Sequence, residues 1–121
     1  MSSRDRDAAL RAAHGEATKA TKQSSDSTGW PRDIVSVSAV RQAMTVTDSN
    51  TGHECLSGSV AVIKLIGNFP HIAVSPPPGA SSTEVHAVIA TADLRSGQIC
   101  LVSVQTGQVA PSPHATLLFE R

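Results

Sequence analysis

The chain has 121 residues, and ten Lys and Arg residues balance ten Asp and Glu residues, so its formal net charge at pH 7 is zero. This balance argues against nucleic-acid binding, because a protein that neutralises phosphates carries a basic surface. The large aromatic residues are Trp30, Phe69 and Phe119, too few to build a surface on which bases or sugars stack. The length allows a single domain.

The first 29 residues are predicted to form a tail and a linker outside the folded domain. Residues 3–23 are rich in alanine, which favours helix, but they contain one leucine to bury against a core. We therefore expect a frayed helix or a disordered segment there. Residues 24–29 (SSDSTG) have the composition of a linker. Trp30 then opens the domain proper, residues 30–121, and is expected to anchor the edge of its sheet.

Residues 34–47 allow two interpretations. Residues 34–37 (IVSV) read as a strand. Ser38 could then cap a short helix over residues 38–44, which would make the fold α+β. The alternative is one strand with an irregularity near Ser38, and we favour this strand.

The most apolar stretch, residues 56–69, is predicted to be a central or interface strand. Apolar residues alternate onto both of its faces, which is typical of a strand that is covered on both sides. Residues 75–82 follow, and their three consecutive prolines favour an extended connector. From these two segments we take the candidate partner-binding residues Val60, Val62, Ile66, Pro76, Pro77 and Pro78.

Residues 84–106 give the clearest signal in the chain. Two runs of alternating β-branched residues flank Asp93-Leu94-Arg95-Ser96-Gly97, in which an Asp can bond a backbone N–H and a late Gly can adopt a positive φ. This pattern predicts a β-hairpin with a bulged turn. Residues 115–119 (ATLLF) predict a last short strand. The fold class expected is therefore mainly β, a small antiparallel sheet or sandwich of hairpins.

One pattern occurs twice, 45 residues apart. Residues 48–56 and residues 93–101 both read D-x-x-[S/T]-G-x-x-C-L, each behind a strand-like run. Repeats at such a spacing can mark a duplicated unit of secondary structure. A common turn sequence followed by a chance Cys-Leu would look the same.

The repeated pattern contains both cysteines, Cys55 and Cys100. Two cysteines form a disulfide in many exported proteins and are usually buried thiols in the cytoplasm, and we favour buried thiols. A metal site would recruit His53 and His86, but no C-x-x-C or H-x-x-x-H spacing supports one. We expect no metal and no cofactor.

Two stretches resemble known families. Residues 45–62 (TVTDSNTGHECLSGSVAV) resemble the opening of carboxypeptidase-regulatory-like, transthyretin-like β-sandwich domains, V-x-D-x-x-T-G-x-x-L-x-G-A-x-V. Residues 85–104 (VHAVIATADLRSGQICLVSV) are similar to the last hairpin of PepSY-like domains, V-x-V-D-x-x-T-G-x-V-x-x-V, which place a helix ahead of their strands. The first resemblance implies a structural or adhesion module, and the second implies binding or inhibition of a partner.

The sequence contains no nucleophile or nucleotide motif such as G-x-S-x-G, S-x-x-K or G-x-x-x-x-G-K-[S/T]. We therefore expect a non-enzymatic protein-binding or assembly module, with a protein partner or a second copy of itself. One alternative is a small ligand-binding protein or enzyme with a pocket near His86 and the cysteines. Another is an exported, disulfide-stabilised domain.

The location expected by default is cytoplasmic. The start, MSSRDRDAAL, lacks the apolar region of a signal peptide, although an exported protein whose leader had been removed would look the same. The longest apolar run, residues 60–66, is interrupted by Lys64 and is too short to span a bilayer. We therefore expect no membrane partner.

Overall fold

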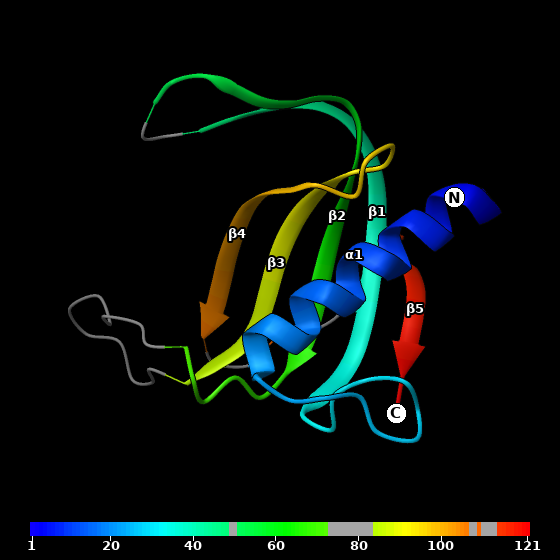
Figure 1. The fold of residues 1–121 in the computed structure, drawn as a ribbon, viewed down its shortest axis with the longest axis vertical. Helices are drawn as coiled ribbons and strands as arrows, with labels where there is room; N and C mark the ends of the chain where they lie inside the picture. The colour runs from blue at the N-terminus through cyan, green and yellow to red at the C-terminus, as the bar shows by residue number, and fades with distance from the viewer. Residues whose placement is uncertain (49–50, 73–83, 107–108, 110–113) are drawn as a thin grey trace.

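The computed structural model describes residues 1–48, 51–72, 84–106, 109 and 114–121. One helix, α1 (Ser3–Thr21), precedes five strands: β1 (Ile34–Thr47), β2 (Glu54–Gly67), β3 (Val85–Asp93), β4 (Ile99–Thr106) and β5 (Thr116–Glu120). The strands form one antiparallel sheet in the order β4-β3-β2-β1-β5 (Figure 1). The mainly antiparallel β fold predicted from the sequence is confirmed.

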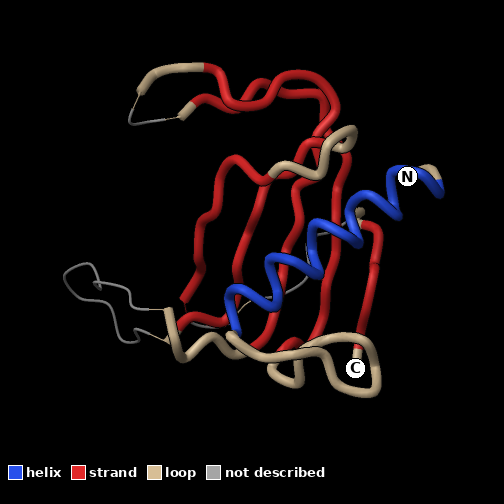
Figure 2. Tube along the Cα trace, viewed as in Figure 1, coloured by secondary structure: helices blue, strands red, loops and turns tan. Residues whose placement is uncertain are grey.

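Helix α1 lies across one face of this sheet, where it contacts β1, β2 and β3 (Figure 2). Ser2 caps its start by accepting a hydrogen bond from the Asp5 N–H at 3.1 Å, and Lys22 ends it in the left-handed region at φ 55°. The expectation of a frayed or disordered N-terminal segment is therefore wrong. The helix can dock because alanine is small. A helix face without long side chains can lie close to a sheet that supplies the large side chains. The buried alanines are Ala8, Ala9, Ala12, Ala13, Ala17 and Ala20.

Two aromatic contacts connect the helix to the sheet edge. The imidazole of His14 stacks on the ring of Trp30, with 3.8 Å between centroids, and Trp30 lies 5.4 Å from the ring of Phe119 in β5. Trp30 is almost completely buried between these elements. Trp30 is thus part of the hydrophobic core, whereas residues 24–29 before it are exposed.

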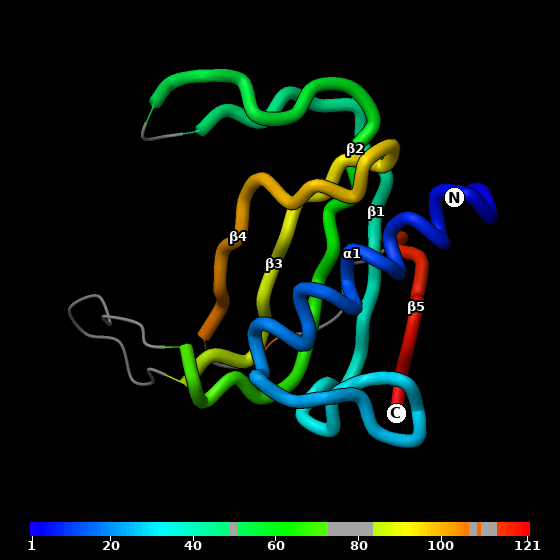
Figure 3. The backbone as a smooth tube through the Cα atoms, in the orientation of Figure 1, coloured from blue at the N-terminus to red at the C-terminus, as the bar shows by residue number. Residues whose placement is uncertain are grey.

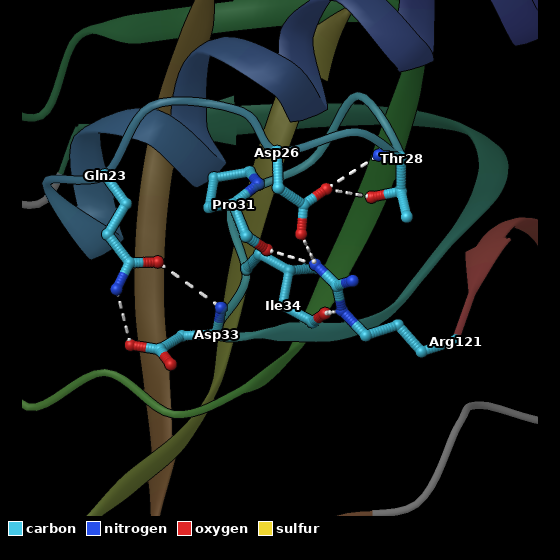
Figure 4. A network of polar contacts seen from close by, with 7 residues as sticks. All are labelled: Gln23, Asp26, Thr28, Pro31, Asp33, Ile34 and Arg121. Carbon is cyan, nitrogen blue, oxygen red and sulfur yellow. Dashed lines mark hydrogen bonds and ion pairs between the residues drawn. The ribbon is translucent and has the colours of Figure 1, made fainter.

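Arg121, directly after β5, holds the segment between α1 and β1 in place (Figure 4). Its guanidinium donates to the backbone oxygens of Ile34 (2.6 Å) and Pro31 (2.7 Å) and pairs with the Asp26 carboxylate at 3.0 Å. Thr28 also donates to Asp26 through its hydroxyl and its backbone N–H. These Thr28 hydrogen bonds, and to a smaller degree Arg121, lower the pKa of Asp26. The network is structural, because its members bind one another and two backbone carbonyls.

Strand β1 is continuous from Ile34 to Thr47, so the alternative of a helix over residues 38–44 is wrong. Its pairing with β2 runs from Ile34 opposite Gly67 to Thr47 opposite Glu54, with one irregularity near each end. The far ends of this pair extend beyond the other strands as an arm, residues 44–48 and 51–58, which curves over the start of β4 (Figure 3). Gly58 stands opposite Met44 at φ 111°, a conformation that favours glycine, where the arm begins.

The predicted central position is confirmed, since β2 lies third of five in the sheet, but helix α1 covers only one of its faces. Ala61, Ile63 and Leu65 are completely buried in the core beneath the helix. Residues 62, 64 and 66 alternate with them and lie on the opposite face, which no helix of the described residues covers. We call this the open face.

The described residues of the two hairpin turns make the same backbone hydrogen bonds, as the repeated pattern suggests. The Gly97 N–H donates to the Asp93 carbonyl at 2.8 Å and the Asp93 N–H to the Gln98 carbonyl at 2.9 Å. In the first turn Gly52 and Asp48 make the corresponding bonds at 2.8 and 2.9 Å. Gly52 and Gly97 have φ values of 73° and 75°. Cys55 and Cys100 are then each the second residue of the following strand, β2 or β4. Duplication of the hairpin stays a prediction, now with matching geometry.

Candidate functional site

Strand β4 is an edge of the sheet, with β3 as its one neighbour among the described strands. Its sequence, ICLVSVQT, contains no charged residue and no proline. Edge strands of monomeric proteins usually carry charges, prolines or covering segments, because their unpaired N–H and C=O groups can bind another strand. Strand β4 therefore has the composition of a pairing edge.

Two large aliphatic side chains of β4 are exposed, one on each face of the sheet. Leu101 stands opposite Thr91 and keeps 50% of its surface exposed, and Val102 stands opposite Ala90 and keeps 44% exposed. Successive residues of a strand point to opposite faces, so these two side chains flank the open edge. A strand added beside β4 would cover both of them.

A disulfide ties the arm to the start of β4. The sulfurs of Cys55 and Cys100 are bonded, and the Cα atoms of the two residues are 6.1 Å apart. Beside it, Val46, Leu56 and Val60 form a second buried cluster, with Met44 packed against them. The structure thus has the disulfide, one of the three states that the sequence left open, rather than the buried free thiols that we favoured.

The candidate partner-binding residues of β2 do not form one exposed surface. Val60 is buried under the arm, whereas Val62 and Ile66 lie half-buried on the open face. Because residues 60–66 of β2 pair with both β1 and β3, their backbone offers no edge to a partner. Pro76, Pro77 and Pro78 lie outside the described residues.

A shallow pocket of about 250 Å³ lies on the open face. Apolar and polar side chains share its lining, with no carboxylate, imidazole or thiol among them. Such a lining can hold a small amphiphilic group, toward which Ser38 contributes a hydroxyl and Lys64 an amine. The lining residues are Ser38, Val40, Gln42, Val62, Lys64, Ile89 and Ala115.

The groups of the ligand-binding alternative do not come together. His86 lies near the start of β3, where its Nε2 is 3.4 Å from a carboxylate oxygen of Glu84. Cys100 lies at the other end of the β3–β4 pair, and His53 is exposed on the arm. In the part of the chain that the structure describes, no three His, Cys, Asp or Glu side chains are grouped so as to hold a metal ion.

Comparison of this chain with protein-family models, with curated proteins and with solved structures finds no match. None of the described helical residues forms a helix with the length and hydropathy needed to cross a membrane. The functional assignment therefore depends on the geometry of the sheet alone.

Sequence reasoning did not identify β4 as an exposed edge. We selected the most apolar strand, but a strand that is apolar on both faces lies in the middle of a sheet. The sequence signal of β4 is weaker. It consists of eight uncharged residues, among which the adjacent Leu101 and Val102 point to opposite faces of the sheet. It gains meaning only when the strand order is known.

Proposed function

We propose that this protein is a non-enzymatic binding module that pairs an extended strand of a protein partner along β4. The observation that carries the proposal is the uncharged β4 edge with Leu101 and Val102 exposed on its two faces.

Strand addition combines two sources of affinity. The backbone of the added strand bonds the outward N–H and C=O groups of β4, and its side chains cover alternate residues on each face. Complete burial of a Leu or Val side chain contributes about 1.5–3 kcal/mol. The disulfide holds the start of β4 against the arm, which limits the conformations the edge can adopt before it binds.

The test uses variants on the two edges of the sheet. Leu101→Lys with Val102→Lys places charges on β4, and Leu117→Lys is the matched control, because Leu117 is 45% exposed on the opposite edge strand β5. The probe is a labelled peptide of residues 99–106 carrying Cys100→Ser. Fluorescence anisotropy measures its binding, and hydrogen exchange measures protection of the β4 amides.

We expect saturable binding that protects β4 and that the double variant weakens about tenfold or more, while the β5 variant leaves it unchanged. Absence of binding by the wild-type protein would refute strand addition at β4. An equal loss in both variants would mean that the peptide adheres to apolar surface without using this edge.

We also infer that the protein works in an oxidising compartment, as the exported alternative requires. The disulfide supports this inference, because cytosolic thiols are kept reduced and structural disulfides persist in exported proteins. Protein alkylated directly in its source cells is expected to carry no label on Cys55 or Cys100. Labelling of both residues in intact mass spectra would place the functional protein in a reducing compartment.

A further inference from the structure

A depression of about 300 Å³ lies between helix α1 and the β3–β4 turn. Arg11 lines it from the helix, and Arg95 lines it from the turn. Between them the lining consists of small residues, Ala8, Ala12, Ser96 and Gly97, so no long side chain fills the space. Two arginines from elements distant in the sequence thus line one concave site.

Neither guanidinium is neutralised. Among the described residues the ion pairs that involve arginine are those of Arg41 with Asp5 and of Arg121 with Asp26. Arg11 and Arg95 have no side-chain hydrogen bond and no ion pair with the described part of the chain. Asp7, one helical turn before Arg11, does not come within ion-pair distance of it.

The carboxylate of Asp93, at the start of this turn, accepts hydrogen bonds from backbone N–H groups. Oδ1 of Asp93 accepts hydrogen bonds from the N–H groups of Arg95 at 2.6 Å and Ser96 at 3.3 Å. The Ser96 Oγ accepts from the Gln98 N–H at 3.2 Å, and this leaves the hydroxyl proton of Ser96 able to donate. The depression therefore offers two fork-shaped cationic donors and one hydroxyl donor.

We propose that this depression is a binding site for a phosphate-type oxyanion, with Arg11 and Arg95 as the charged donors. A guanidinium matches phosphate through two parallel N–H···O bonds, and two such groups match the charge of a dianion. The small residues of the lining leave room for the anion between the two forks. Because both arginines are exposed, binding is expected to weaken steeply as salt is raised.

The test titrates the full, oxidised protein with inorganic phosphate and follows the backbone amide NMR signals. Arg11→Gln and Arg95→Gln remove one donor each, and Arg95→Lys keeps the charge but loses the fork. Arg6→Gln is the matched control, because Arg6 is also exposed on α1 and changes the net charge equally without lining the depression. Sulfate and chloride serve as comparison anions.

We expect saturable shifts at Ser96 and Gly97 and an affinity that falls about tenfold in each glutamine variant of the site. Arg95→Lys is expected to fall between these variants and the wild type, and Arg6→Gln to match the wild type. Shifts that do not saturate, or an equal loss in Arg6→Gln, would overturn the site in favour of general attraction to a basic surface. The outcome is independent of strand addition at β4, since neither arginine lies on that strand.

Discussion

Removal of the disulfide by Cys55→Ala together with Cys100→Ala is expected to lower the free energy of unfolding by about 4 kcal/mol, from the chain entropy of the closed loop. The bridged residues are 45 apart in sequence, so the bond excludes many extended conformations of the unfolded chain. Urea unfolding of the oxidised wild type and of the double variant measures the difference. For a small domain this is a large part of the total stability, which is typically 5–15 kcal/mol.

The loss is expected to have a local component as well. Val46, Leu56 and Val60 pack beside the disulfide, at the end of the sheet opposite to the Trp30 contacts. Hydrogen exchange at Val46 and Leu56 should therefore accelerate more than exchange at Ile63 in the centre of the core. Reduced wild-type protein is the control and should behave as the double variant does. A double variant as stable as the oxidised wild type would show that the arm docks without the bond.

The substitution Gly67→Ala is expected to destabilise the protein by about 2–3 kcal/mol, as an overpacked core position does. A Cβ atom at residue 67 would lie 2.0 Å from the carbonyl oxygen of Asp33. This neighbour is backbone and cannot rotate away, and the same oxygen accepts a hydrogen bond from the Asn68 N–H at 3.0 Å. Relief of the clash must therefore shift the start of β1 relative to the end of β2.

Gly15→Ala provides the matched control for this substitution. Gly15 is exposed in helix α1, and a Cβ there meets nothing within 4 Å. Alanine should stabilise the helix by about 0.5–1 kcal/mol, because glycine loses more backbone entropy on folding. Thermal unfolding of both variants should shift in opposite directions. Equal stability of Gly67→Ala and the wild type would mean that the backbones of β1 and β2 do not approach so closely.

Local patterns predicted those parts of the fold whose determinants lie close together in the sequence. The turn from Asp93 to Gly97 was predicted because its aspartate and glycine act within five residues. Strand β2 was placed in the centre of the sheet because both of its faces are apolar. The continuity of β1 was favoured correctly, although propensity alone left it ambiguous.

The docking of helix α1 could not be predicted in the same way. Its alanines bury little surface of their own, and their environment is supplied by Ile63 and Leu65 about 50 residues later. The stack of His14 on Trp30 likewise joins residues that no periodicity connects. The composition of the first 29 residues therefore indicated a helix with small apolar side chains. It did not reveal the sheet on which this helix packs.

The candidate site depends on tertiary structure in two further respects. Strand β4 is an edge because β5 pairs with β1 instead of with β4, a choice that neither strand's sequence reveals. The approach of Arg11 to Arg95 depends on where the helix crosses the sheet. Sequence reasoning thus proposed binding as the class of function, but it selected residues of the central strand and prolines outside the described residues.

The pairing of β5 with β1 has a consequence for the chain as it is being synthesised. Strand β1 emerges early, and β2 covers only one of its sides. Its other side stays unpaired until residues 116–120 leave the ribosome. The carbonyls of Pro31 and Ile34 likewise lack their hydrogen bonds from the Arg121 guanidinium until then. Until β5 is made, the edge of β1 is therefore open to strands of other chains, and rapid completion of the chain or a chaperone would protect it.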